Sequence, residues 1–313
     1  MRVLVTGGAG FIGSHLVDRL VARGDQVSVI DSFSTGKREN LTHHGDRITV
    51  HEADVRDAAA VDRAIKGCEL VFHEAAVVSV PYSVDHPQET HDVNIQGTLN
   101  VLLAARKNRV RRVVFASSAA VYGDEPTLPK SESMLPEPIA PYGVEKLTSE
   151  HYLRTFARLY DVETVALRYF NVFGPRQDPS SPYSGVISVF VQRLLAGAPV
   201  TIFGDGLQSR DFVYVADVVD ANLLAGSTKG ASGRVYNVAR GERTTLLELA
   251  AMLGKIMGNE TGPTLAAERA GDIRHSHAAI DRARGELAYG PRVALETGLT
   301  ALVEHERKRR ALA

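Results

Sequence analysis

A glycine-rich turn near the start of the chain constrains the fold more than any other feature of the sequence. Gly7, Gly10 and Gly13 follow the short apolar run Val3–Thr6 and open a helical pattern over Phe11–Arg23. In this G-x-x-G-x-x-G spacing, one glycine makes the turn, one lets the backbone approach a pyrophosphate, and one lets the helix pack on the strand. Backbone amides at the start of the helix can then bind the phosphates. The turn predicts a dinucleotide site; the alternative is a glycine turn without a ligand.

The first half of the chain continues this alternation of strands and helices. Short apolar runs predict further buried strands at Val27–Ile30, Ile48–His51, Leu70–His73, Val113–Ala116 and Thr164–Arg168. Helical patterns lie between them at Ala58–Lys66, Val93–Asn108 and Gly143–Tyr160. Alternation of this kind implies right-handed crossovers and a parallel sheet covered on both faces. We therefore expect the α/β class, with a Rossmann-type doubly wound sheet whose ligands bind at the carboxyl ends of the strands.

The alternation breaks after about Arg168. Residues 174–182 are rich in turn-forming types, and shorter helical and extended pieces follow them. We therefore predict a nucleotide-binding domain over residues 1–170 and a smaller α/β substrate domain over residues 171–313. The second domain is expected to cap the sheet and to be interleaved with the first.

Acidic residues at the ends of two predicted strands refine the nucleotide site. Asp31 ends the second strand, 18 residues after Gly13, where a carboxylate can accept hydrogen bonds from ribose hydroxyls. The same charge would repel a 2′-phosphate, so NAD is favoured over NADP. Asp54 and Val55 follow the third strand and could reach the adenine. Capping of the helix at Ala58 by Asp54 is the alternative.

A phenol and an ammonium group mark a candidate catalytic centre. Tyr142 and Lys146 stand at i and i+4 of a predicted helix, so they share one face. Ser117 and Ser118 end the preceding strand at the same edge of the sheet. A phenol with an ordinary pKa of about 10 needs a lower pKa to act as a base near neutrality. The Lys146 ammonium and a positive nicotinamide ring would both lower that pKa; the alternative is a chance surface pair.

Composition removes several classes of function. The chain has 36 Lys and Arg against 37 Asp and Glu, a net charge of −1, which gives no global electrostatic case for nucleic-acid binding. We find no apolar run of bilayer-spanning length, no room for a leader peptide before the first strand, and a lone Cys68, and so expect a cytoplasmic protein. His275 and His277 lack a third ligand at a sensible spacing, so we expect no metal site.

Taken in chain order, the motifs resemble the extended short-chain dehydrogenase/reductase superfamily, and within it the UDP-hexose 4-epimerases. The resemblance rests on the glycine turn, the Tyr142-x-x-x-Lys146 pair, and the stretches Ser117–Gly123, Leu167–Pro175, Arg210–Asp217 and Arg269–Arg274. It implies that NAD is the cofactor. The implied NAD contacts are Gly7, Gly10, Phe11, Ile12, Gly13, Asp31, Asp54, Val55, Tyr142, Lys146 and Tyr169.

The resemblance also assigns roles around the sugar. Ser118 would bind the 4′-hydroxyl, Tyr142 would be the general base, and Lys146 would hold the nicotinamide ribose. The UDP contacts would be Asn171, Arg210, Arg269 and Asp272. Guanidinium groups suit a diphosphate on physical grounds. Surface ion pairs of the two arginines with Asp211 and Asp272 are the alternative.

Two alanines after Ser118 distinguish reactions within the superfamily. Sugar 4,6-dehydratases and nucleotide-sugar decarboxylases carry acidic residues at these positions, whereas this chain has Ala119 and Ala120. An epimerase needs no such group, because hydride leaves and returns to C4 of the sugar. A ketoreductase or dehydrogenase of the same superfamily, and a dinucleotide sensor without catalysis, remain as alternatives.

Substrate and assembly are expectations from the resemblance. Small Ser276 stands where bulk limits the sugar's 2-substituent, so both hexoses and N-acetylhexosamines are expected to fit; the alternative is a plain loop residue. UDP-glucuronate ranks third, because Asp178 stands where its epimerases use a basic residue. Asn94 matches a site-organising position, although helix capping is the local role we expect. A homodimer is expected through Val93–Asn108 and Gly143–Tyr160.

Overall fold

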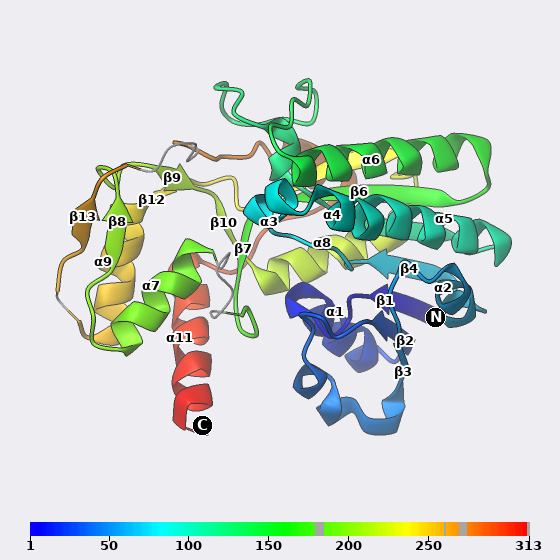
Figure 1. Ribbon diagram of the computed structural model, residues 1–313, viewed down its shortest axis with the longest axis horizontal. Helices are drawn as coiled ribbons and strands as arrows, with labels where there is room; N and C mark the ends of the chain where they lie inside the picture. Colours follow the sequence, from blue (N-terminus) through cyan, green and yellow to red (C-terminus); the bar gives the residue numbers. More distant parts are fainter. Residues whose placement is uncertain (179–184, 260, 269–273, 312–313) are drawn as a thin grey trace.

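The computed structural model describes residues 1–178, 185–259, 261–268 and 274–311. Its centre is a seven-stranded sheet in the order β11-β6-β5-β4-β1-β2-β3 (Figure 1). Every neighbouring pair in this sheet is parallel. The strands are β1 (Arg2–Thr6), β2 (Gln26–Asp31), β3 (Ile48–Glu52), β4 (Leu70–His73), β5 (Arg112–Ser118), β6 (Glu163–Tyr169) and β11 (Arg234–Val238). The predicted Rossmann-type α/β sheet is confirmed.

Helices cover both faces of the sheet, because alternate residues of each strand point to opposite faces. Val3 and Val5 of β1 pack in a core with helices α1 (Phe11–Ala22) and α8 (Val215–Ser227). Leu4 between them packs in a second core with helices α2 (Ala58–Ile65), α5 (Gly97–Lys107) and α6 (Pro141–Leu159). The carboxyl ends of the strands are thereby left as the edge at which a ligand can approach.

The helix predicted over Val93–Asn108 is divided in the structure. A short π-helical segment, Asp92–Gln96, precedes α5. Within it the carbonyl oxygen of Asn94 accepts hydrogen bonds from the hydroxyls of Thr98, at 2.6 Å, and Ser149, at 3.2 Å. Because π-helical turns often occur at functional sites, this segment draws attention to Asn94.

The C-terminal part has its own apolar core beside the sheet (Figure 1). Helices α7 (Val186–Leu195), α9 (Leu246–Met257) and α11 (Leu295–Ala311) surround it. Three small sheets complete this part: β7 (Asn171–Phe173) with β10 (Phe212–Tyr214), β9 (Ser209–Arg210) with β12 (Thr244–Thr245), and β8 (Thr201–Phe203) with β13 (Thr264–Ala266). Strand β11 nevertheless belongs to the main sheet, and helix α8 packs against that sheet, although both follow residue 170. The division at residues 170 and 171 stays a prediction.

Shorter helices connect these elements. They are α3 (Val80–Asp85), α4 (Pro87–His91), α10 (Asp281–Leu287) and 3-10 turns at Arg38–Asn40, Thr42–Arg47 and Ala119–Tyr122. Among the helices of the described ranges, none is both long enough and apolar enough to cross a bilayer.

A buried ion pair joins α6 to the sheet. Glu150 of α6 accepts two hydrogen bonds from the guanidinium of Arg168 on β6, at 2.8 and 2.7 Å, and a third from the hydroxyl of Ser117 on β5, at 2.6 Å. Both members of the pair are almost fully buried: 3% of the Arg168 side chain and 1% of the Glu150 side chain are exposed. Removing one partner of such a pair leaves an uncompensated buried charge.

Glu150→Ala should therefore destabilise the protein by about 3–5 kcal/mol, because the Arg168 guanidinium loses its carboxylate inside the fold. Chemical unfolding measures the change. The matched control is Lys107→Ala, which removes an exposed ion pair with Asp62 and should cost less than about 1 kcal/mol. Similar losses in the two variants would contradict the importance of the buried pair.

Candidate active site

The glycine turn is shaped by close contacts of the backbone. Gly7 has φ of +67°, and a Cβ atom added to it would lie 2.8 Å from the amide nitrogen of Ala75. A Cβ atom on Gly13 would lie 2.2 Å from the carbonyl oxygen of Gly7, so only glycine lets α1 pack this close. Gly10 caps α1 without a side-chain hydrogen bond, and no acidic residue stands in the first turn. The first amides of α1, where Phe11 and Ile12 lie, therefore suit an anion.

Asp31 connects the glycine turn to the end of β2. Its buried carboxylate accepts hydrogen bonds from the amides of Ala9, at 2.9 Å, and Phe33, at 2.8 Å, and burial raises its pKa. Each carboxylate oxygen has two acceptor positions, so the group can take further donors. A contact of Asp31 with ribose hydroxyls stays a prediction. The structure shows a second role of Asp31, which is to hold the glycine turn through the amide of Ala9.

Asp54 does not cap the following helix. Its carboxylate pairs with the Arg56 guanidinium at 2.8 Å, and this hydrogen bonding lowers the pKa of Asp54. Helix α2 is capped instead by Asp57, which accepts from the amides of Ala59 and Ala60. The capping alternative for Asp54 is therefore wrong, because α2 begins at Ala58 and Asp57, directly before it, accepts the hydrogen bonds of the first free helical amides. Val55 is buried beside α2 and α5; adenine contacts of either residue stay predictions.

Ser118, Tyr142 and Lys146 come together at the carboxyl edge of the sheet. Ser118 is the last residue of β5, and the other two lie in the first turns of α6. The Lys146 ammonium donates to the carbonyl oxygen of Ala116 at 2.8 Å and lies 5.7 Å from the centroid of the Tyr142 ring. Ser118 is close enough to the phenol for hydrogen bonding with it to lower the Tyr142 pKa. Tyr142 and Lys146 are almost fully buried, at 7% and 3% exposure.

The electrostatics of this centre differ from the expectation. Burial raises the pKa of Tyr142 to about 12, although hydrogen bonding with Ser118 opposes the rise. Burial also lowers the pKa of Lys146 to about 8, against the opposing effect of nearby carboxylates. In the protein by itself, burial outweighs the interactions that would lower the phenol pKa. The lowering of that pKa by Lys146 and the nicotinamide stays a prediction. The chain contributes a dry, hydrogen-bonded phenol, and further positive charge is needed to favour the phenolate.

Glu74, a site residue that the sequence motifs did not indicate, follows β4 at the same edge. The Tyr169 hydroxyl donates to a Glu74 carboxylate oxygen at 2.9 Å and accepts from the Asn222 side-chain amide at 2.7 Å. Burial raises the pKa of Glu74 to about 7, while the Tyr169 hydrogen bond and the positive charge of Lys146 act in the opposite direction. The position of Glu74 directly after a buried strand was the available signal.

Asn94 organises the site rather than capping a helix. Its side chain accepts from the amide of Val77 at 2.9 Å and donates to the Val77 carbonyl oxygen at 3.0 Å. It also donates to the Glu145 carboxylate at 2.6 Å, and Thr90 donates to the other oxygen of that group at 2.6 Å. The capping role expected for Asn94 is therefore wrong, because its partners are a distant loop and α6. This network fixes the helix that carries Tyr142.

His73 ends β4 in a closed environment. Its ring nitrogens are hydrogen-bonded with the hydroxyls of Thr6, at 2.7 Å, and Thr98, at 3.0 Å. Full burial lowers its pKa to about 3, so the ring is neutral at physiological pH. His73 is thus a strand-end residue that the fold uses internally, not a base open to a substrate.

The predicted substrate residues fall in two groups. Asn171 begins β7, and Arg210 lies on β9, where its guanidinium donates to the carbonyl oxygen of Ser209 at 3.0 Å. The amide of Ser276 donates to the same Ser209 carbonyl at 2.9 Å, which places the specificity candidate beside the strand of Arg210. Arg269 and Asp272 lie outside the described residues.

Asp211, next to Arg210, has a structural role of its own. Its buried carboxylate accepts from the backbone amides of Arg240, Gly241 and Ala278, and burial raises its pKa to about 6. Asp211 is therefore a buried carboxylate held by backbone amides, and it is not a surface counterion of Arg210.

Glu74→Gln tests the electrostatic account of the site through stability. The folded protein raises the Glu74 pKa from 4.5 to about 7, so between these values the folded state keeps a proton that the unfolded chain has released. This group therefore destabilises the wild type increasingly as pH rises through that window. As the pH is raised from about 5 to about 8, the unfolding temperature of the variant should rise relative to that of the wild type. The exposed Glu304→Gln is the control; a Glu74→Gln curve parallel to the wild type would contradict the account.

Comparisons with known proteins agree with this geometry. The NAD-dependent epimerase/dehydratase family matches residues 3–239. The UDP-glucose 4-epimerase of Mycolicibacterium smegmatis is 42% identical over an alignment of 313 positions that covers 99% of each chain.

Two solved structures share the whole fold. The UDP-glucose 4-epimerase of Thermotoga maritima, solved with UDP-glucose, has a TM-score of 0.94 and 41% identity, covering 99% of this chain and 100% of that one. The UDP-N-acetylglucosamine 4-epimerase of Methanobrevibacter ruminantium, solved with UDP-N-acetylmuramic acid, has a TM-score of 0.94 and 39% identity, covering 98% of both. The chain belongs to the NAD-dependent epimerase/dehydratase family.

Proposed function

We propose that this protein is an NAD-dependent UDP-hexose 4-epimerase that interconverts UDP-glucose and UDP-galactose, and also the UDP-N-acetylhexosamine pair. The observation that carries the proposal is the meeting of Ser118, Tyr142 and Lys146 at the carboxyl edge of the sheet, the edge at which the glycine turn follows β1. The full-length similarity to 4-epimerases supports the same activity. A dinucleotide sensor without catalysis would not need this set of side chains.

The chemistry follows from the positions of these groups. Bound NAD⁺ supplies the hydride acceptor and the positive charge that the buried phenol lacks. The Tyr142 oxygen takes the proton of the sugar 4-hydroxyl, and Ser118 aligns that hydroxyl by hydrogen bonding. The sugar becomes a 4-keto sugar, turns about its diphosphate, and receives hydride and proton on the other face. Lys146, held at the Ala116 carbonyl, positions the nicotinamide ribose.

Ala119 and Ala120 separate this reaction from elimination. They begin the 3-10 turn Ala119–Tyr122 that directly follows Ser118. With Ser118 at the sugar 4-hydroxyl, these are the positions from which an added acid or base would act in an elimination. Methyl side chains cannot transfer protons. We therefore favour epimerisation over dehydration or decarboxylation of the sugar.

The UDP part is anchored by the C-terminal residues in this proposal. Arg210 and Asn171 contribute from β9 and β7, and Arg269 and Asp272 are assigned by resemblance. Strong binding of the diphosphate combined with a loosely held hexose suits a reaction in which the sugar must rotate to present its other face. Residues 171–313 are accordingly proposed as the substrate domain and residues 1–170 as the NAD domain.

We also propose a homodimer formed through α5 and α6. These helices lie side by side on one face of the sheet (Figure 1). They expose large apolar side chains, with Leu103 46%, Val144 48% and Leu159 67% exposed. Burial of such a surface against a second copy would remove it from water.

The buried free thiol of Cys68 suits a reducing compartment, which supports a cytoplasmic location.

Tyr142→Phe tests the mechanism. Purified wild type should interconvert the UDP-hexoses without added reductant, and the variant should lose at least about a hundredfold in kcat because no base remains at the 4-hydroxyl. Product formation is followed by chromatography of the nucleotide sugars, and the cofactor is identified after denaturation. Tyr160→Phe is the control, because Tyr160 follows the last residue of α6, at the opposite end of the helix from Tyr142. Full activity in Tyr142→Phe would overturn the mechanism, and stoichiometric consumption of NADH or NADPH would identify a ketoreductase instead.

Ser276→Tyr tests the substrate range. An aromatic side chain beside the strand of Arg210 should exclude the bulky 2-substituent of N-acetylhexosamines while leaving space for a hydroxyl. We expect at least about a tenfold loss of kcat/KM for UDP-N-acetylglucosamine and little change for UDP-glucose. Ser276→Ala is the matched control and should keep both activities. Equal losses for both substrates in Ser276→Tyr would remove Ser276 as the specificity determinant.

A further inference from the structure

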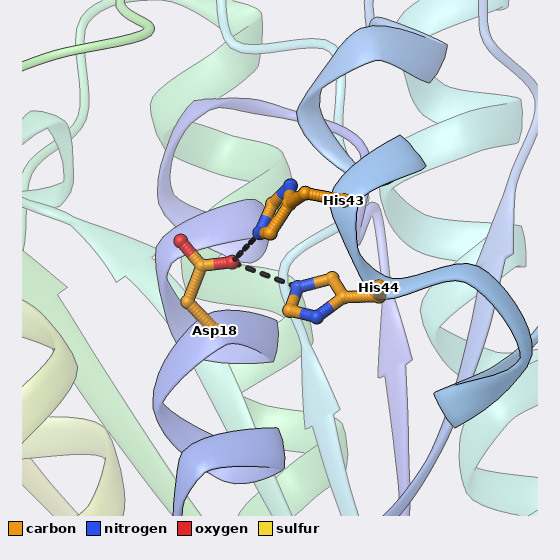
Figure 2. A group of neighbouring side chains, drawn as sticks. All are labelled: Asp18, His43 and His44. Atoms are coloured by element: carbon orange, nitrogen blue, oxygen red, sulfur yellow. Dashed lines mark hydrogen bonds and ion pairs between the residues drawn. The ribbon is translucent and has the colours of Figure 1, made fainter.

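Three metal-ligating side chains meet outside the active site (Figure 2). Asp18 lies on α1, and His43 and His44 lie on the 3-10 turn Thr42–Arg47. The Nε2 atoms of both histidines lie 2.8 Å from the same oxygen, Oδ1, of Asp18. One donor atom from each of the three residues falls within 4.8 Å of the others. Both imidazole Nε2 atoms thus converge on the Asp18 carboxylate, and the three donor atoms form one compact cluster.

The donor set suits a first-row transition metal. Imidazole nitrogen and carboxylate oxygen bind Zn²⁺ at about 2.0–2.2 Å, and two imidazoles favour such an ion over Mg²⁺ or Ca²⁺. Donors at these bond lengths on a tetrahedron are about 3.3 Å apart. The two Nε2–Oδ1 separations of 2.8 Å would thus need to open by about half an ångström to admit the ion.

The surroundings hold the carboxylate in place. The guanidinium of Arg176 lies 2.8 Å from Oδ2 of Asp18, so it occupies that oxygen and leaves Oδ1 facing the histidines. Second-shell hydrogen bonding of this kind orients a ligating carboxylate. His44 is buried, with 4% of its side chain exposed, whereas 47% of the His43 side chain is exposed. An ion can consequently enter from the His43 side.

We propose that Asp18, His43 and His44 form a binding site for one Zn²⁺-like transition-metal ion, with a remaining coordination position open to water. The nearby Arg176 charge disfavours a cation. Coordination through His44 Nε2 also places the ring proton on a buried Nδ1 atom that has no hydrogen-bond partner in the described part of the chain. The affinity is therefore expected to be lower than that of a structural four-ligand zinc site.

This site departs from the expectation of no metal. The sequence pattern draws attention only to His275 and His277, because the spacing of these two residues is local. Asp18 and His43 are 25 residues apart, and the fold alone brings them together. The site also differs from the proposed catalytic centre, to which none of its three ligands contributes.

Zinc binding to the full-length protein with its bound NAD tests the proposal. After chelator treatment and dialysis, calorimetric titration with ZnCl₂ should show one site per chain. Zinc at saturation should also raise the unfolding temperature, because it binds the folded state. His43→Gln, at the exposed position, and Asp18→Asn should each weaken zinc binding at least about tenfold. His91→Gln, an exposed histidine of α4, is the matched control and should bind as the wild type does.

Two outcomes would overturn the proposal. One is the absence of heat and of thermal stabilisation in the wild type at about 100 µM free zinc. The other is wild-type affinity in His43→Gln, which would place any bound zinc elsewhere in the chain. His43→Gln should unfold at the wild-type temperature without zinc, so a loss of binding in it reports ligation and not misfolding. Epimerase activity does not enter either measurement, so failure here is distinguishable from failure of the proposed function.

Discussion

Two buried carboxylates on one helix determine where the reactive side chains of this protein lie. Glu145 of α6 accepts from Thr90 and Asn94, and Glu150, further along the same helix, accepts from Ser117 and Arg168. A buried carboxylate must be paired, so these contacts fix both the rotation and the position of α6. Tyr142 and Lys146 take their places at the sheet edge as a consequence of that fixation.

The same burial that positions the site also sets its charge. Lys146 has Glu74, Glu145 and Glu150 around it, yet desolvation still lowers its pKa to about 8. Tyr142 remains protonated in this environment. The protein thus prepares geometry and low polarity, and leaves to a positively charged ligand the final shift toward phenolate. Coupling of this kind makes proton removal depend on the presence of the oxidised cofactor.

Local patterns predicted most of the fold, because they are decided by neighbours in sequence. Strand β4 has the bounds Leu70–His73 that its apolar run indicated, and α2 begins at Ala58, where its helical pattern begins. The glycine turn was predictable for the same reason, since its constraint lies within one strand-turn-helix unit. The roles proposed for Ser118, Tyr142 and Lys146 rest on the family resemblance.

What escaped prediction depends on distant partners. Asn94 contacts Val77 and Glu145, which are 17 and 51 residues away, so its local helix-capping chemistry was misleading. The pKa of Tyr142 reflects burial that no spacing reveals. Glu74 acquires its setting from Tyr169, 95 residues later. In each case the decisive contact is made by tertiary packing.

The place of β11 in the main sheet has a consequence for synthesis of the chain. Strand β6 pairs with β5 on one side and with β11 on the other, from Arg234↔Val165 to Val238↔Tyr169. Until the ribosome has released residues 234–238, β6 presents an open row of amides and carbonyls along one side. An unfinished chain is therefore a template for aggregation during that interval, and a fragment ending near residue 170 would keep this hazard permanently.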